Sequence, residues 1–175
     1  MTDADAELGA MDLAEYLRSA ERRGDMEQWV GGLERYGHRC CVRALVALSR
    51  LTLPLWESAY PHDPSQRRAI EAAEAWLADP GTAQERAAHL ACEESYRSRI
   101  AVQAEGPAEL AASAAEATSY AAAARVLSPG IAPRHVAANA LRIVVAEVQS
   151  LYTGEAIPTQ AEITEAISRS LGSEG

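Results

Sequence analysis

Apolar residues recur at intervals of three and four along most of the chain, which is the period of an α-helix that buries one face. Glycine and proline separate these stretches. The pattern predicts about seven helices, at residues 12–23, 25–36, 38–60, 65–77, 82–104, 108–127 and 134–152, with a short final helix that ends near residue 171. The third helix carries a regular stripe formed by Val42, Leu45, Leu48, Thr52, Leu55 and Ala59. The helix at 134–152 is the most apolar, and we place it at the centre of the fold.

Helix boundaries are indicated by several local signals. The pair Gly31-Gly32 is either a break or a place where another helix packs closely, and Pro54 should kink or break the third helix. Asp63-Pro64 has the pattern of an N-cap followed by the first helical residue. Thr82 to Glu85 and Thr159 to Glu162 both have the capping-box spacing, so each predicts a helix start.

The composition favours helices over strands. Alanine accounts for 37 of the 175 residues, whereas valine, isoleucine and threonine together account for 23. Alanine loses no side-chain entropy in a helix, while β-branched residues favour strands. We therefore expect an all-α fold with one domain over residues 1–175, either a helical bundle or an irregular stack of helical hairpins. Residues 1–10 and 172–175 should be frayed.

The charge of the chain narrows the class of partner. Asp and Glu total 25 against 16 basic residues, all of them arginine, and the formal net charge is -9. Nucleic-acid-binding domains are usually basic, so we expect no nucleic-acid partner. An acidic surface instead favours encounter with a basic protein. A homo-oligomer is compatible with the sequence, because the apolar face of the helix at 134–152 can be buried in the core or between two copies.

Neither a membrane span nor a targeting segment is indicated. No apolar run approaches the length of a membrane-spanning helix, and the acidic N-terminus lacks the basic and apolar regions of a signal peptide. Three cysteines, Cys40, Cys41 and Cys92, give no evident disulfide framework. We therefore expect a cytoplasmic protein with no membrane partner.

Two short segments are weak candidates for a metal site. In the first, His89, Cys92 and Glu93 follow each other at i, i+3 and i+4, which is a workable arc of ligands on one helix. The second, Glu34, His38 and Cys41, has a spacing similar to that of the first. We favour a partly exposed histidine beside a small buried cysteine, and we expect neither a metal nor another cofactor. A nucleophile elbow, a P-loop and a dinucleotide fingerprint are all absent from the sequence, so nothing in it requires an enzyme.

The most distinctive segment is the turn after the third helix, where tryptophan, tyrosine, arginine and carboxylates are concentrated. Its candidates for partner or ligand binding are Trp56, Glu57, Tyr60, Asp63, Arg67, Arg68 and Trp76. A hairpin would bring Glu57 toward Arg67 or Arg68 in a bidentate ion pair, with aromatic rings packed around the turn. We favour a structural staple, and the alternative is a recognition surface, since tryptophan, tyrosine and arginine dominate binding hot spots.

The same residues also carry a family resemblance. The matching stretch comprises Trp56-Glu57, Pro61, Asp63, Arg67-Arg68, Ala69-Ile70-Glu71-Ala72 and Trp76-Leu77, with a weaker continuation at Arg86-Ala87-Ala88 and His135-Val136-Ala137-Ala138. It resembles bacterial immunity proteins associated with polymorphic toxin systems, over roughly residues 38–150. The resemblance implies a small, alanine-rich, cytoplasmic helical protein that binds and neutralises a cognate toxin.

Two functional classes follow. The leading hypothesis is a non-catalytic immunity or interaction protein whose partner is a protein, with a basic toxin as the candidate. The alternative is a small-molecule-binding protein or an enzyme with a pocket at the Trp56–Trp76 hairpin. A deep pocket with an unpaired arginine would favour the alternative. A satisfied Glu57–arginine pair beneath packed tryptophans would instead favour a scaffold.

Overall fold

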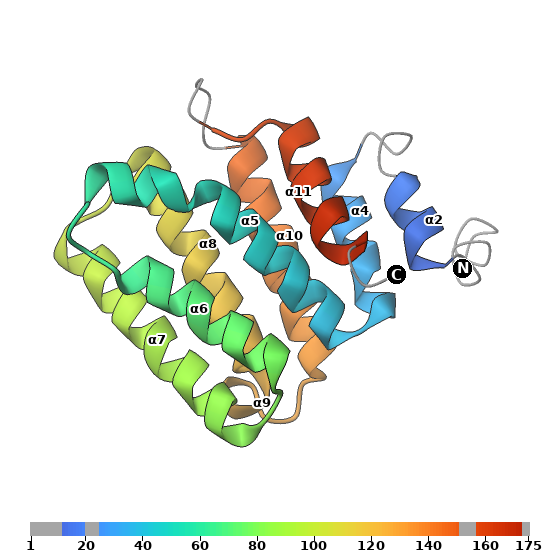
Figure 1. The fold of residues 1–175 in the computed structure, drawn as a ribbon, viewed down its shortest axis with the longest axis horizontal. Helices are drawn as coiled ribbons and strands as arrows, with labels where there is room; N and C mark the ends of the chain where they lie inside the picture. Colours follow the sequence, from blue (N-terminus) through green and yellow to red (C-terminus); the bar gives the residue numbers. More distant parts are fainter. Residues whose placement is uncertain (1–11, 20–24, 151–156, 173–175) are drawn as a thin grey trace.

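The computed structural model describes residues 12–19, 25–150 and 157–172, and all the regular secondary structure in these ranges is helical (Figure 1). The all-α prediction is therefore confirmed, and the prediction of about seven helices is roughly right. The helices are α2 (Leu13–Arg18), α4 (Met26–Gly31), the 3-10 helix η1 (Gly32–Tyr36), α5 (His38–Ala59), α6 (Ser65–Ala78), α7 (Thr82–Ala101), α8 (Gly106–Ala122), α9 (Ala124–Leu127), α10 (Pro133–Ser150) and α11 (Gln160–Gly172). The terminal stretches that we expected to fray lie outside these residues, apart from Gly172, which ends α11. None of the described helices is both long and apolar enough to cross a membrane.

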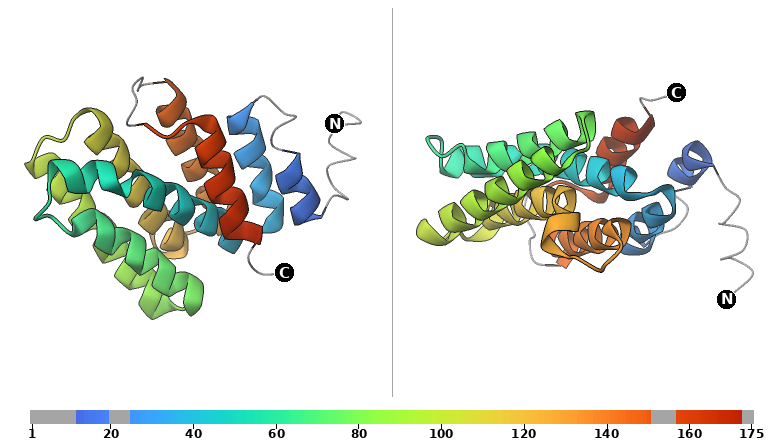
Figure 2. Two further views of the ribbon diagram at one scale, coloured as in Figure 1. Left: turned by 45° about the horizontal axis from the view of Figure 1, so that its top comes forward. Right: turned by 90° about the horizontal axis from the view of Figure 1, so that it is seen from below.

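The helix at the centre of the fold is the alanine-rich α8, which contacts α5, α6, α7 and α10. Its buried face consists mostly of small residues: Ala108, Leu110, Ala111, Ala112, Ala114, Ala115, Thr118, Ser119, Ala121 and Ala122. Small side chains let neighbouring helices approach closely. Helix α10, which we expected at the centre, packs against α8, α5, α4 and η1. Its other side lies at the edge of the molecule away from α6 (Figure 2, right). Its Ile143 is 51% exposed.

Helix α5 runs without interruption through Pro54. Proline removes one backbone donor from a helix, and Pro54 lies on the exposed side of α5. A break at this position is therefore not observed. The predicted stripe is buried at Val42, Leu45, Leu48 and Thr52, whereas Leu55 is half-buried and Ala59 is exposed at the helix end.

The pair Gly31-Gly32 is both a break between helices and a place where another helix packs closely. Helix α4 ends at Gly31, and the tighter 3-10 helix begins at Gly32. A Cβ on Gly32 would lie 1.9 Å from the Tyr16 hydroxyl. This hydroxyl is buried and donates a hydrogen bond of 2.6 Å to the carbonyl of Trp29. Glycine is therefore required where α2 packs against the start of η1.

The capping signals gave mixed results. At Thr159, the hydroxyl accepts from the Glu162 amide at 3.3 Å and the Glu162 carboxylate accepts from the Thr159 amide at 2.7 Å, so this capping box is confirmed. The prediction of a capping box at Thr82 was wrong, because Thr82 is already the first helical residue of α7. The Glu85 side chain is buried, and its carboxylate lies 3.7 Å from the guanidinium of Arg125 in α9. A tertiary ion pair here replaces the local cap.

Two predicted helices end differently in the structure. Helix α7 ends at Ala101, before the predicted end, and Gln103 then takes a positive φ of 50°. The helix predicted at 108–127 is divided into α8 and α9 at Ala123. The predicted end of α10 at Leu151 and Tyr152 lies outside the described residues.

Candidate functional site

The turn between α5 and α6 is organised around Trp56, which is completely buried. Its indole N–H donates to the carbonyl of Asp63 at 3.2 Å, and its ring lies 4.5 Å from the ring of Tyr60. Alanines from the start of α8 complete this small apolar cluster. The tryptophan therefore ties the end of α5 to the loop and to α8, and it presents no surface to a partner.

The prediction that Asp63 is the N-cap of the following helix was wrong by one residue, because α6 begins at Ser65 and Pro64 holds the N-cap position. The Asp63 carboxylate accepts from the Ser65 amide at 2.9 Å and from the hydroxyl of Ser98 on α7. Burial alone would raise the pKa of the Asp63 carboxyl, but these hydrogen bonds outweigh it and lower the pKa. Asp63 is thus a fully engaged acceptor that joins the loop to two helices.

Both arginines of the hairpin are paired. The Arg67 guanidinium contacts the Glu57 carboxylate across the turn, and Arg68 donates to Glu94 of α7 at 2.9 Å. All four side chains are at least one-third exposed. Exposed pairs of this kind contribute about 0–1 kcal/mol to stability.

Trp76 is separated from the other hairpin candidates because it lies near the far end of α6. It is 2% exposed, and its ring lies 4.6 Å from the His38 ring at the start of α5. The Nε2 atom of His38 is 2.7 Å from the carbonyl of Ala121 in α8. Trp76 therefore belongs to a second junction between α5, α6 and α8.

The hairpin forms a small hollow that is open to solvent. It has a volume of about 400 Å³ and is lined by Glu57, Pro61, His62, Asp63, Pro64 and Arg67. Glu57 and Arg67 already neutralise each other, and Asp63 is occupied by its hydrogen bonds. These are the features expected of a staple, with a satisfied ion pair and buried tryptophans.

The weak metal candidates do not converge. His89 Nε2 lies 3.5 Å from Glu93 Oε1, and Glu93 also pairs with Arg97 at 2.7 Å. The Cys92 thiol faces the Glu116 carbonyl at 3.6 Å, and burial raises its pKa. Within the described ranges, no three metal-ligating side chains lie close enough to hold an ion.

A groove between α8 and α10 is the site that the sequence analysis missed. It has a volume of about 560 Å³, and Ser128 and Ile131 of the loop between α9 and α10 line one end. The lining residues are Ser113, Ala117, Tyr120, Ser128, Ile131, His135, Val136, Asn139, Ala140, Ile143, Val144 and Glu147. Ile131 and Ile143 are more than half exposed, and Tyr120 is 37% exposed. The groove is therefore an apolar surface open to solvent.

The two ends of this groove differ in their polar groups. At one end, the hydroxyls of Tyr120 and Ser128 form a hydrogen bond of 2.8 Å. There, Nδ1 of His135 lies 3.3 Å from Oε1 of Glu34. At the other end is the Glu147 carboxylate, whose pKa is raised by burial and by the negative charge of a neighbouring carboxylate. The acidic end thus has a charge that is partly removed from water.

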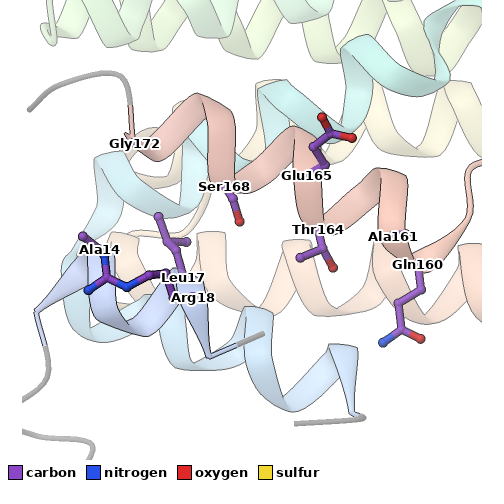
Figure 3. A pocket seen from close by; sticks show the side chains of 9 residues that line it. All are labelled: Ala14, Leu17, Arg18, Gln160, Ala161, Thr164, Glu165, Ser168 and Gly172. Carbon is purple, nitrogen blue, oxygen red and sulfur yellow. The ribbon is translucent and has the colours of Figure 1, made fainter. Parts of the chain in front are cut away.

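A larger hollow of about 980 Å³ lies between α2 and α11 (Figure 3). Thr164 and Ser168 of α11 point toward α2 in this view. Its polar lining residues are all half-buried or exposed, and Glu165 is already paired with Arg169. The hollow therefore lacks a desolvated polar group, among the described residues, that would orient a ligand.

Comparison with known proteins adds no functional assignment. No family model, curated protein or solved structure matches the chain. The fold and the groove are therefore the basis for a functional proposal. The resemblance of the hairpin to immunity proteins stays a prediction.

Proposed function

We propose that the chain is a non-catalytic interaction protein of the immunity type, which binds a cognate protein toxin in the cytoplasm and neutralises it. The observation that supports this most directly is the α8–α10 groove, which is lined by the exposed side chains of Tyr120, Ile131 and Ile143. Exposed apolar surface of this kind marks sites of interaction. A shallow, open groove on helices suits a segment of another protein.

The charge of the chain supports a basic partner. The formal net charge is -9, and one end of the groove carries the Glu147 carboxylate. Complementary charge speeds the encounter of two proteins and fixes their orientation, while apolar contact supplies most of the affinity. The groove offers both contributions on one surface.

The alternative, a small-molecule site or an active site at the hairpin, receives less support. A ligand in the hairpin hollow would have to break the Glu57–Arg67 pair before it gained either partner. The tryptophans at positions 56 and 76 are buried, so neither ring can stack on a ligand without local unfolding. The hairpin therefore supports the fold rather than a binding reaction.

The test uses the reading frame beside this gene. Its product is expressed in bacteria with and without this chain, and growth is measured. Wild-type chain should restore growth, whereas Ile143→Glu should not, because the apolar contact that supplies most of the affinity would be replaced by a charged group that must lose its water on binding. Leu90→Glu on α7 is the matched control, since Leu90 is 65% exposed and Ile143 51%. This control should restore growth like the wild type.

Two results would contradict the proposal at different points. A neighbouring product that inhibits growth in the presence of the wild-type chain as strongly as in its absence would refute neutralisation. Full protection by Ile143→Glu would leave neutralisation intact but refute the groove as its surface. Melting temperatures of both variants, measured on purified protein, should match the wild type, because both positions are exposed.

A further inference from the structure

The acidic end of the α8–α10 groove contains a carboxylate without a direct partner. Glu147 of α10 is half-buried and lines the groove, yet it makes no hydrogen bond or ion pair with the described part of the chain. A desolvated carboxylate normally acquires a partner, because removing charge from water costs free energy. Glu147 therefore lies at a position that is unfavourable for the isolated protein.

The surroundings of Glu147 increase this cost. Among the described residues, the Arg99 guanidinium on α7 opposes the rise in the pKa of Glu147, but this group is already paired with other carboxylates. Arg99 forms a bidentate pair with Glu116 of α8, at 2.8 and 3.2 Å, and lies 3.7 Å from Glu109. Three carboxylates thus surround one cation, and the acidic end is left with an excess of negative charge.

The apolar wall of the groove continues directly from this end. Ile143 lies one helical turn before Glu147 on α10, and Ala117 of α8 and Ala140 of α10 also line the groove. An arginine side chain fits this combination, since its aliphatic stem can lie along apolar surface while its guanidinium reaches a carboxylate. A lysine offers one compact charge, whereas the planar guanidinium can contact a carboxylate through two N–H groups.

We propose that the α8–α10 groove docks an apolar segment of a partner protein that carries an arginine, with the guanidinium placed at Glu147 and the stem along Ile143. The inference rests on the proposed function for the identity of the occupant. An arginine, a cation with an apolar stem, is complementary to an apolar groove that ends in excess negative charge. Binding would supply Glu147 with the partner that the free chain lacks.

The experiment uses octylguanidinium as the probe and octylurea as its uncharged counterpart, both kept below the concentration at which they form micelles. Each is titrated into isotopically labelled protein, and the amide signals of α8 and α10 are followed by NMR. Glu147→Gln removes the charge while keeping the size of the side chain. Glu71→Gln is the matched control, because Glu71 is an exposed carboxylate on α6, outside the groove.

The wild type should bind octylguanidinium about tenfold more tightly than octylurea, as expected for a hydrogen bond to a charged group. This preference should persist in Glu71→Gln and be lost in Glu147→Gln. The signals that move should belong to groove residues. Glu147→Gln should keep the melting temperature of the wild type or raise it, which shows that its loss of preference is not unfolding.

Equal affinity for the two probes, no binding of either, or an unchanged preference in Glu147→Gln would overturn the inference. Shifts confined to signals outside the groove would overturn it as well. These outcomes are distinguishable from failure of the proposed function. A chain that prefers octylguanidinium through Glu147 but does not neutralise its neighbour would retain the docking chemistry and lose the immunity role.

Discussion

The hairpin between α5 and α6 should depend on one buried tryptophan far more than on its exposed ion pair. Trp56→Ala removes a side chain with 0% exposure, together with its hydrogen bond to the Asp63 carbonyl and its contact with Tyr60. Replacing a buried tryptophan by alanine costs about 3–5 kcal/mol. Glu57→Ala removes a pair in which Arg67 is 48% and Glu57 36% exposed, and such pairs contribute about 0–1 kcal/mol.

The free energies of unfolding are to be measured by urea denaturation, followed by far-ultraviolet circular dichroism. The free energy of unfolding of Trp56→Phe should lie between those of the two alanine variants. Phenylalanine keeps an aromatic ring in the cluster, but it leaves the Asp63 carbonyl without its donor, which costs about 1–3 kcal/mol. A loss in Glu57→Ala as large as that in Trp56→Ala would refute the reasoning. It would mean that the exposed pair, and not the buried ring, holds the hairpin together.

Three further predictions concern packing, pH and the ion pair between Arg99 of α7 and Glu116 of α8. Gly32→Ala should lower the free energy of unfolding by about 1–3 kcal/mol, because the new Cβ would lie 1.9 Å from the Tyr16 hydroxyl. Burial lowers the pKa of His38 from its ordinary value of 6.5 in the folded chain. As the pH falls, the unfolded chain therefore binds a proton at this histidine before the folded chain does. The free energy of unfolding should thus decrease as the pH drops below about 6.5. Arg99→Ala should cost about 1–3 kcal/mol in urea denaturation, because the half-buried Glu116 carboxylate loses its partner.

Each of these predictions has a control. Gly31→Ala should be neutral or stabilising, since the nearest atom to its Cβ is Cδ of the exposed Arg142 side chain, which can move. His38→Gln should weaken the fall in stability below pH 6.5. Equal effects of the two glycine variants would contradict the close approach of α2. An unchanged pH profile in His38→Gln, or an Arg99→Ala variant as stable as the wild type, would contradict the electrostatic arguments.

The helical class and most helix ranges followed from the sequence because they depend on local periodicity and on composition. The stripe from Val42 to Thr52 is buried as expected, and the capping box at Thr159 forms because its two partners lie within one turn. The box at Thr82 has the same spacing but does not form. Glu85 turns instead toward Arg125, a residue that periodicity cannot bring near.

The groove could not be found in the same way. In α10, Val148 faces the core and Ile143 faces the groove, while the buried Val144 lines the floor between them, although all three fit one broad apolar stripe. The width of this stripe could have indicated the groove from the sequence. A helix that is apolar on more than one face has more apolar surface than a single core can cover. The partner of Arg99 and the isolation of Glu147 depend on how three helices pack, which no spacing in the sequence encodes.

The most direct test of the docking surface is amide hydrogen exchange of the chain with and without the product of the neighbouring gene. If the partner docks in the groove, amide exchange should slow on binding at residues 113–120 of α8 and 136–147 of α10, with no change along α7 or at the turn between α5 and α6. Protection centred on residues 57–67, with the groove unchanged, would contradict the account and return the binding surface to the hairpin.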